Sequence, residues 1–154
     1  MEYNVDRAII LAGGLGSRFL PATKAIAKEL FPIGSRPALL FLLEEVYQSG
    51  IRKVCIVTSK SKLPIFKKLL SHDKKLEVAL KNLGRLDVLE ELNRYIDEME
   101  ITILLQGKLN GFGGAVYTTK DWTEGKPFAI LCGDDLFLPT KGQKPVTDSN
   151  LNLH

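Results

Sequence analysis

The sequence contains few of the residues that build disulfide frameworks and zinc sites. Its 154 residues include two cysteines, Cys55 and Cys132, and two histidines, His72 and His154. Each cysteine lies within an apolar stretch, where a small buried thiol is the usual role, and neither belongs to a C-x-x-C pair. The histidines have no partners at the spacing of metal ligands. A disulfide-stabilised fold and a zinc site are therefore not expected.

Long apolar runs and a strong net charge are also absent. The run "ALLFLL" is followed directly by Glu44 and Glu45, and it is far shorter than the roughly 20 residues that cross a membrane. The first apolar stretch, Ala8–Ala12, is too short for a signal peptide. The net charge of +3 is too small to indicate nucleic-acid binding. We therefore expect a cytoplasmic protein that binds neither membranes nor nucleic acid.

The sequence is instead rich in short apolar segments that alternate with helical patterns. Four continuous apolar runs closed by turn residues predict buried strands: "RAIILAGG", "KVCIVT", "EITILLQG" and "PFAILCGD". Helices are predicted between them, at "RPALLFLLEEVYQSG", near Leu63 to Leu70, from Lys75 to about Met99 with a candidate break at Gly84, and at "GGAVYTTKDW". Strands that alternate with helices predict an α/β fold with a mostly parallel sheet.

The middle of the chain carries a group of lysines that are followed closely by acidic residues. This mixture is typical of helix faces that point into solvent. The lysines assigned to this solvated surface are Lys60, Lys62, Lys67, Lys68, Lys74 and Lys75.

Three unusual loops follow three of the predicted strands. "GGLGSR" follows the first strand, "QGKLNGFGG" the third and "GDD" the fourth. Because ligands of parallel sheets bind beyond the carboxyl ends of the strands, we expect all three loops at one edge of the sheet. The long irregular stretch from Leu15 to Ser35 supports a functional loop, since such loops are uncommon inside compact domains.

The glycine loop matches neither of two familiar phosphate-binding patterns. No G-x-x-x-x-G-K-[ST] sequence begins at Gly13 or Gly14, so the loop is not a Walker loop. In a G-x-G-x-x-G reading the third glycine position holds Phe19, and the second strand ends in Thr58-Ser59-Lys60 without the acid that binds a ribose. A nicotinamide cofactor is therefore disfavoured.

The chemistry of the loop still points to a phosphate group. Successive backbone N–H groups in a glycine turn form an anion-binding concavity, and glycines let a flat base approach the backbone. Arg18 offers a planar fork of donors to a di- or triphosphate, while Lys24 and Lys28 offer point charges. The alternative is a solvated loop that merely contains a glycine turn.

The amino-acid sequences of these loops resemble those of one known family. "LAGGLGSRFLPATKAIAKELFPIGSRP" resembles the signature of sugar-nucleotide pyrophosphorylases and, among them, the bacterial UTP–glucose-1-phosphate uridylyltransferases. "QGKLNGFGGAV" resembles the second nucleotide-contacting loop of that branch, and "ILCGDDLF" resembles its metal-binding strand end. The resemblance implies a Rossmann-like three-layer nucleotidyltransferase fold that is incomplete at its C-terminal side. Residues 1–138 would form the N-terminal portion of the nucleotide-binding domain, and residues 139–154 a polar tail.

The resemblance also implies which residues would hold the nucleoside. Three backbone positions would contact uracil and ribose: Ala12, Gly13 and Gly14. Glu29 would read the edge of the uracil, and Gln106 would hydrogen-bond the base with Gly111 beside it. Read without the resemblance, Gln106 is a surface residue and Glu29 a loop residue paired with Lys28 or Lys24.

The remaining implied roles concern the phosphates. Arg18 would hold the β- and γ-phosphates, and Lys28 the phosphates near the reacting centre, so these two are the candidate catalytic residues. Asp134 would ligate Mg²⁺, which prefers oxygen ligands from one or two carboxylates and substrate phosphates. The alternative for Asp134 and Asp135 is an ordinary turn at the end of a strand.

The sequence departs from the branch in two residues and in length. Ala27 stands where proline is usual, and Gly114 stands where histidine is usual. Family members are longer, and their second half supplies the sugar-phosphate site, a second metal-ligating aspartate and a lysine for the sugar phosphate.

Three functions follow as hypotheses. The resemblance favours uridylyl transfer from UTP to glucose 1-phosphate, giving UDP-glucose and pyrophosphate, by a chain that is catalytically incomplete unless a homo-oligomer or a complementing chain supplies the missing half. The alternatives are a non-catalytic UTP-binding module and a truncated remnant without activity of its own.

Overall fold

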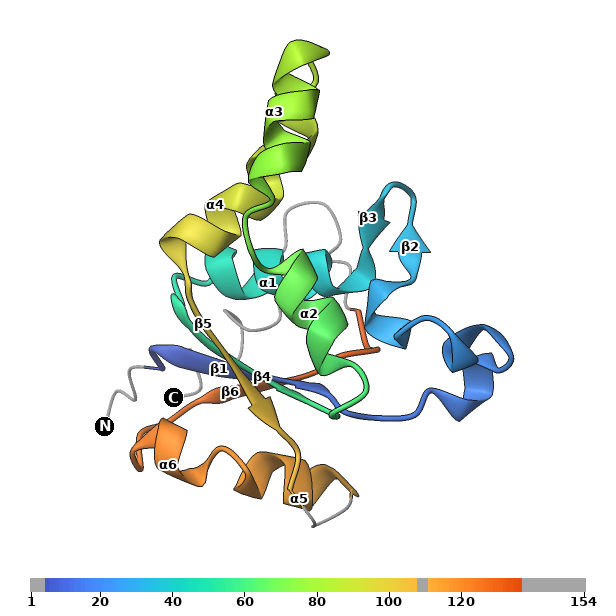
Figure 1. Cartoon of the computed structure of the whole chain (residues 1–154). Helices are drawn as coiled ribbons and strands as arrows, with labels where there is room; N and C mark the ends of the chain where they lie inside the picture. Colours follow the sequence, from blue (N-terminus) through green and yellow to red (C-terminus); the bar gives the residue numbers. More distant parts are fainter. Residues whose placement is uncertain (1–4, 108–110, 137–154) are drawn as a thin grey trace.

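The computed structural model describes residues 5–107 and 111–136, and the predicted tail at 139–154 lies outside this range. Four parallel strands form the central sheet in the order β5-β4-β1-β6 (Figure 1). These strands are β1 (Arg7–Ala12), β4 (Lys53–Thr58), β5 (Glu100–Leu105) and β6 (Ala129–Cys132). All four lie at the predicted apolar runs, so the predicted parallel α/β sheet is confirmed.

The two central strands are buried on both faces, as their unbroken apolar sequence requires. Along β1, alternate side chains enter two separate clusters, because successive residues of a strand point to opposite faces. Ile10 packs with Leu39 and Leu43 on one face, while Ile9 packs with Cys55 on the other. The register places Ile9 opposite Cys55 on β4, so both strands contribute to both clusters.

Helices cover both faces of the sheet and give the predicted three layers. In Figure 1, α1 and α2 lie on one side of the strands, and α5 and α6 lie on the other. The helices are α1 (Ala38–Gln48), α2 (Leu63–Leu69), α3 (Lys74–Asn82), α4 (Glu90–Glu98), α5 (Gly111–Tyr117) and α6 (Lys120–Thr123). A short antiparallel ribbon of β2 (Pro32–Ile33) and β3 (Arg36–Pro37) precedes α1.

Helix α1 ends as the sequence predicts. Gly50 follows the helix with a φ of 82°, a conformation that glycine adopts without strain. Its N–H donates to the carbonyl of Tyr47 at 3.1 Å, and the N–H of Ile51 donates to the carbonyl of Val46 at 3.2 Å. This pair of hydrogen bonds is the Schellman pattern, and it satisfies carbonyls that the end of a helix leaves without partners.

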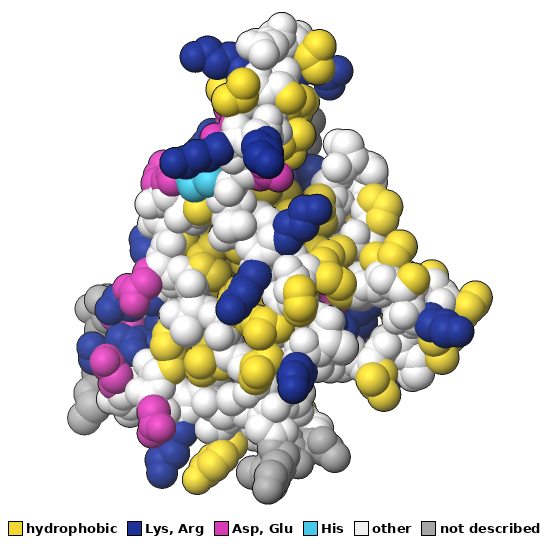
Figure 2. Space-filling model, in the orientation of Figure 1, with side chains coloured by type: hydrophobic (Ala, Val, Ile, Leu, Met, Phe, Trp, Pro, Cys, Tyr) yellow, Lys and Arg dark blue, Asp and Glu magenta, His cyan; other side chains and the backbone are white. Residues whose placement is uncertain are grey.

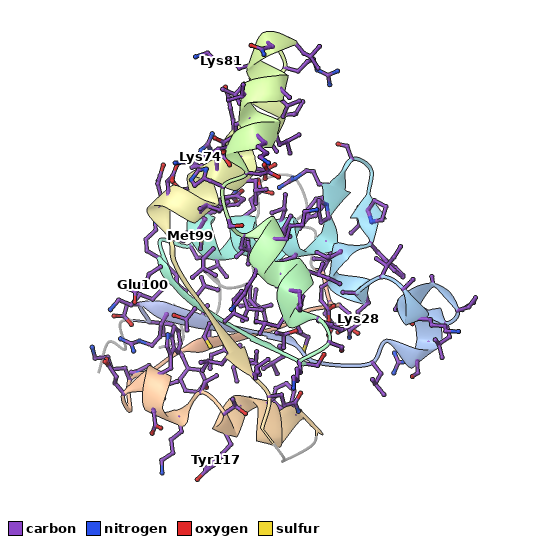
Figure 3. The ribbon with its side chains drawn as sticks, in the orientation of Figure 1. Lys28, Lys74, Lys81, Met99, Glu100 and Tyr117 are labelled. Carbon is purple, nitrogen blue, oxygen red and sulfur yellow. The ribbon has the colours of Figure 1, made fainter. Side chains whose placement is uncertain are left out.

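The long helical pattern after residue 75 is divided into two helices that form a projecting arm (residues 74–98). Gly84, with a φ of 66°, separates α3 from a short 3₁₀ turn (Leu86–Leu89) and α4, so the predicted break is confirmed. The arm extends away from the sheet at the top of Figure 1, and Lys74 and Lys81 mark α3 in Figure 3. Figure 2 shows basic and apolar side chains next to each other on it. Helix α3 buries no residue of its own.

The base of the arm is attached to the body by polar contacts. Nδ1 of His72 lies 2.8 Å from a carboxylate oxygen of Glu77, and Nε2 lies 2.9 Å from one of Asp97, so His72 links the start of α3 to α4. The Asp97 and Glu77 hydrogen bonds raise the pKa of His72. The hydroxyl of Tyr47 on α1 donates to Glu98.

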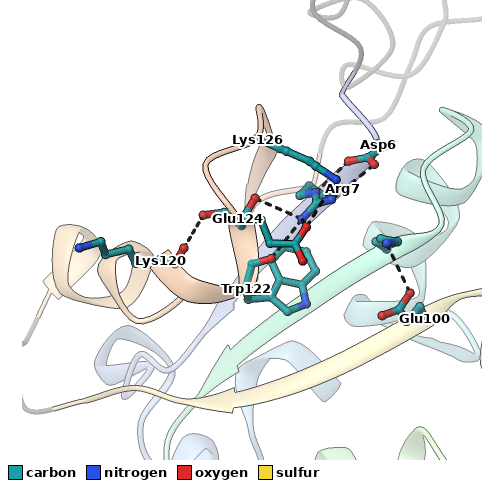
Figure 4. Close-up of polar contacts among 9 residues, drawn as sticks. Asp6, Arg7, Glu100, Lys120, Trp122, Glu124 and Lys126 are labelled. Carbon is teal, nitrogen blue, oxygen red and sulfur yellow. Dashed lines mark hydrogen bonds and ion pairs between the residues drawn. The ribbon is translucent and has the colours of Figure 1, made fainter.

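Buried Arg7 connects the beginning of β1 to α6 (Figure 4). Its side chain is only 2% exposed, and Nη1 donates to the carbonyls of Trp122 at 3.1 Å and Thr123 at 3.2 Å. Asp6 accepts from Nε at 2.8 Å, and this hydrogen bond lowers the pKa of the Asp6 carboxyl. The guanidinium group is thus paired, as a buried charge must be. Trp122 packs against the second cluster.

The two cysteines are free thiols, as expected. Cys55 is buried, and burial raises its pKa to about 12. Within the described residues, no helix is long and apolar enough to cross a membrane.

Candidate active site

The three unusual loops meet at the carboxyl edge of the sheet. The Gly133 N–H donates to the carbonyl of Leu11 at 2.8 Å, which places the end of β6 beside the glycine loop. The Gln106 N–H donates to the carbonyl of Thr58 at 2.8 Å, which brings the end of β5 to the same edge. The predicted convergence follows directly from the parallel register of the four strands.

Other groups approach the backbone of the glycine loop closely at two positions. A Cβ placed on Gly13 would collide with Oε1 of Gln106, so the Gln106 side chain lies directly against the loop. Gly16 has a φ of 65°, and a Cβ there would lie 2.8 Å from Cγ2 of Thr23. The Thr23 hydroxyl donates to the carbonyl of Gly16 at 2.8 Å and closes the turn.

Two base-contact candidates of the second loop are neighbours. Nε2 of Gln106 donates to the carbonyl of Gly111 at 3.3 Å. Gly111 begins α5 with a φ of 83°. Gln106 therefore touches both the glycine loop and the first residue of α5. The intervening residues 108–110 lie outside the described part of the chain.

Lys28 and Asp134 form an ion pair across the edge. Nζ of Lys28 lies 2.6 Å from the Asp134 carboxylate; the lysine side chain is 11% exposed and the aspartate 40%. The hydrogen bond from Lys28 lowers the pKa of Asp134, and the charge of Arg18 acts in the same direction. Nζ of Lys28 also lies 3.5 Å from the position of a Cβ on Gly14. Figure 3 labels Lys28 at this edge.

Arg18 lies in a short 3₁₀ turn (Ser17–Phe19), and its side chain is exposed. It is on the same side of the molecule as Asp134, because its charge contributes to the lowered pKa of that carboxyl. Lys24 ends a second 3₁₀ turn (Ala22–Lys24) and is also exposed. Both cations are available to a ligand without breaking a buried contact.

Glu29 is fully buried, which neither reading of the sequence anticipated. A third 3₁₀ turn (Lys28–Leu30) sends Lys28 toward Asp134 and Glu29 into the interior. The side chain of Glu29 is 0% exposed, and Nζ of Lys62 lies 3.0 and 3.1 Å from its two oxygens. Burial raises the pKa of Glu29, and the charge of Lys62 opposes this shift.

The ion-pair partner of Glu29 is thus Lys62, and not Lys28 or Lys24 as the alternative interpretation supposed. The assignment of Lys62 to a solvated helix face is also wrong, because its ammonium group lies beneath the glycine loop. One signal in the sequence could have found it. Lys62 follows the carboxyl end of the second strand, which lies at the same edge as the other loops.

Comparison with known proteins identifies the family. Residues 7–144 match the sequence pattern of the nucleotidyl transferases. The chain belongs to the nucleotidyl transferase family. It is 41% identical over 132 residues to the UTP--glucose-1-phosphate uridylyltransferase of Staphylococcus epidermidis and 39% identical over 132 residues to that of Bacillus subtilis. Each of these alignments covers 86% of the chain, and the alignments cover 46% and 45% of the two relatives.

Solved structures agree with this family assignment. An apo UDP-glucose pyrophosphorylase superposes with a TM-score of 0.86 at 25% identity, over 96% of this chain and 53% of that one. The UTP-bound UGPase from Acinetobacter baumannii superposes with a TM-score of 0.82 at 30% identity, over 91% of this chain and 49% of that one. The three-layer nucleotidyltransferase fold is therefore confirmed. The chain spans about half the length of the relatives it matches.

The nucleotidyl transferase edge offers one carboxylate that suits a divalent cation. Asp134 is partly exposed and is held by Lys28 alone among the described side chains that contact it. Within the described residues no group of three or more His, Cys, Asp or Glu side chains could hold a metal ion. An aspartate combined with phosphate oxygens still fits Mg²⁺, which commonly binds one carboxylate together with substrate phosphates.

Ala27, which stands in place of the usual proline, keeps a backbone that proline would accept. Its φ is −63°, which matches the value fixed by a proline ring. Gly114, which stands in place of the usual histidine, lies within α5, where its carbonyl accepts the Thr118 hydroxyl at 3.0 Å. Neither departure disturbs the edge described above.

Proposed function

We propose that this chain is the nucleotide-binding part of an enzyme that transfers a uridylyl group from UTP to glucose 1-phosphate, giving UDP-glucose and pyrophosphate. The observation that carries the proposal is the Lys28–Asp134 ion pair beside Gly14, because it brings together a cation that would bind phosphate and a carboxylate that would bind a metal ion. The names of the curated relatives supply the substrate pair.

The reaction needs charge neutralisation more than covalent chemistry. A phosphate oxygen of glucose 1-phosphate attacks the α-phosphorus of UTP in line, and a new P–O bond forms. The bond between the α-phosphorus and the bridging oxygen breaks, and pyrophosphate leaves with that electron pair. Lys28 would hold phosphate oxygens near the reacting centre, and exposed Arg18 would hold the β- and γ-phosphates. Bound Mg²⁺, held by Asp134 and phosphate oxygens, would supply further positive charge.

The nucleoside would lie over the glycine loop. Backbone groups of Ala12, Gly13 and Gly14 would contact uracil and ribose, since this part of the loop presents no bulky side chain. The amide of Gln106 lies against Gly13 and would hydrogen-bond the base, with Gly111 next to it. The carboxylate of Glu29 is buried under this loop and paired with Lys62. Any effect of Glu29 on the uracil would therefore be indirect, through Lys62. A cytoplasmic location, where UTP is found, belongs to the same proposal.

A second candidate function is a UTP-binding module without turnover. The loops at the carboxyl edge carry this alternative, because they would account for nucleotide binding and none of their residues is assigned to a sugar phosphate. A complementing chain or a second copy would then be the partner that makes the site catalytic.

One assay separates these functions. The chain is mixed with UTP, glucose 1-phosphate and Mg²⁺, and pyrophosphate release is followed while UTP binding is measured by calorimetry. Turnover supports the transferase, and UTP binding without turnover supports the module. Failure to bind UTP contradicts both. CTP and dTTP in place of UTP test the base, and Asp134→Asn tests the metal dependence.

A further inference from the structure

Lys62 makes an unusual set of contacts for a lysine that lies in a surface turn. Its Nζ lies 2.6 Å from the carbonyl of Gly14, 3.2 Å from the carbonyl of Ala12, and 3.0 and 3.1 Å from the two oxygens of Glu29. Its side chain is 13% exposed, whereas nearby Lys60 is exposed. All three protons of the ammonium group therefore have acceptors within the protein.

The two carbonyls determine which way the glycine loop faces. In a trans peptide the C=O and N–H groups point in opposite directions. Because the carbonyls of Ala12 and Gly14 point to Lys62, the N–H groups of Gly13 and Leu15, in the same peptide units, point away from it. Lys62 thus holds two alternate peptide units of the loop with their N–H donors turned to the opposite side, and the Thr58 hydroxyl also donates to the Ala12 carbonyl at 3.3 Å.

The charge of Lys62 is balanced by a carboxylate that is fixed in the interior. Glu29 is fully buried, and its two oxygens are both within hydrogen-bond distance of Nζ. Lys62 therefore differs from exposed Arg18 and from Lys28, whose partner Asp134 is 40% exposed at the edge. Any effect of Lys62 on a bound nucleotide has to pass through the loop.

We propose that Lys62 is a positioning residue of the nucleotide site, whose ammonium group, held by Glu29, keeps the Ala12 and Gly14 carbonyls turned inward so that the loop N–H groups face the nucleotide. This inference rests on the proposed nucleotide site. It assigns Glu29 to the support of the loop through Lys62.

Lys62→Met tests the proposal, because methionine keeps the apolar stem and removes the donors. Lys60→Met is the matched control on an exposed lysine two positions earlier. In the full chain without nucleotide, we expect Lys62→Met to shift the amide resonances of Gly13 and Leu15 and to speed their hydrogen exchange. We expect UTP to bind about tenfold more weakly, the loss that corresponds to one charge-assisted hydrogen-bond network.

The double variant Lys62→Met/Glu29→Gln distinguishes positioning from simple charge balance. It removes both buried charges, so the melting temperature should recover relative to Lys62→Met even if the single variant folds poorly. If UTP affinity stays about tenfold low in the double variant, the loop-positioning role is supported. If affinity recovers together with stability, Lys62 is only the counter-ion of Glu29 and the proposal is overturned.

The loop amides also separate this inference from the proposed function. If the parent chain does not bind UTP, the proposed function fails, yet shifted Gly13 and Leu15 amides in Lys62→Met would still support the positioning of the loop. If Lys62→Met leaves these amides and their exchange like those of Lys60→Met, the inference is overturned whatever the chain binds.

Discussion

The carboxyl edge of the sheet and the helical arm at residues 74–98 use charged residues in opposite ways. At the edge, Lys28 pairs with Asp134 and Lys62 with Glu29, so each pair joins segments that are far apart in the sequence. On the arm, α3 buries none of its residues and projects into solvent. Lys28, Lys62 and Glu29 are thus largely buried in their pairs, whereas the charged side chains of α3 lie on a helix that buries no residue.

The same contrast holds for glycine. Gly133 is enclosed, since a Cβ on it would lie 2.6 Å from the carbonyl of Leu11 and 3.0 Å from Cγ of Glu29. Gly84 of the arm has nothing within 4 Å of such a Cβ and needs glycine only for its φ of 66°. Gly133 of the edge is thus needed for space, and Gly84 of the arm for its backbone conformation.

The largest effect is expected from placing a methyl group at the edge. Gly133→Ala should lower the free energy of unfolding by ~3 kcal/mol, because the backbone carbonyl that it meets cannot move aside cheaply. Gly84→Ala on the arm should cost ~1 kcal/mol, the strain of a left-handed alanine. Urea denaturation of both variants measures the difference. Equal losses would show that the edge is no more tightly packed than the arm.

The next effect concerns arginine and the triphosphate. Arg18→Ala should weaken UTP binding roughly 10- to 100-fold and leave uridine binding nearly unchanged, since only the phosphates need its charge. Arg85→Ala, which removes an exposed arginine from the arm, should change UTP binding by no more than about twofold. Calorimetric titration with both ligands provides the test. A parallel loss of uridine binding in Arg18→Ala would remove Arg18 from the phosphate site.

A smaller and favourable effect is expected in the loop that carries Lys28. Ala27→Pro should raise the free energy of unfolding by ~0.5–1 kcal/mol, because Ala27 already has a φ of −63° and proline restricts the unfolded chain. Ala25→Pro is the matched control, since it removes the N–H that donates to Ala22 at 3.1 Å, and it should destabilise. Thermal melting measures both changes. Destabilisation by Ala27→Pro would show that the folded loop does not accommodate a proline at position 27.

The smallest effect is a pH dependence at the base of the arm. The pKa of His72 is raised by its hydrogen bonds to Asp97 and Glu77, so protonated His72 stabilises the folded chain. This contribution is complete below the unfolded pKa of about 6.5 and is lost as the pH rises through the higher folded pKa. The difference in unfolding free energy between the parent and His72→Gln should therefore shrink from pH 5.5 to pH 8. If the stability difference between the parent and His72→Gln grows with pH, protonated His72 does not stabilise the folded chain.

Much of the fold was predictable because it depends on local pattern. The apolar runs that predict the four strands and the positive φ at Gly50 and Gly84 can both be inferred from neighbouring residues. The meeting of the three loops was also predictable, since parallel strands bring their carboxyl ends together. Gln106 had two interpretations in the sequence, a base contact or an ordinary surface residue. The structure places its side chain against Gly13 of the glycine loop.

The contacts within the site were harder to predict because they depend on side-chain direction. A single 3₁₀ turn sends Lys28 outward and Glu29 inward, and no periodicity in the sequence encodes that choice. Lys62 lies 33 positions from Glu29, and Lys60 also follows the second strand, so the position after that strand does not tell which of the two lysines is buried. Only the three-dimensional arrangement reveals this pair.

The Lys28–Asp134 contact also has a consequence for which anions the chain selects. The ammonium group of Lys28 carries three protons, and Asp134 accepts from it at 2.6 Å, so an incoming anion would compete with the aspartate for that cation. A monovalent anion would meet a competitor of equal charge, whereas a polyanion that carries a metal ion would offer more negative charge to Lys28 and a cation to Asp134. In the proposed site, the pair would therefore favour anions of high valence that arrive with a metal ion.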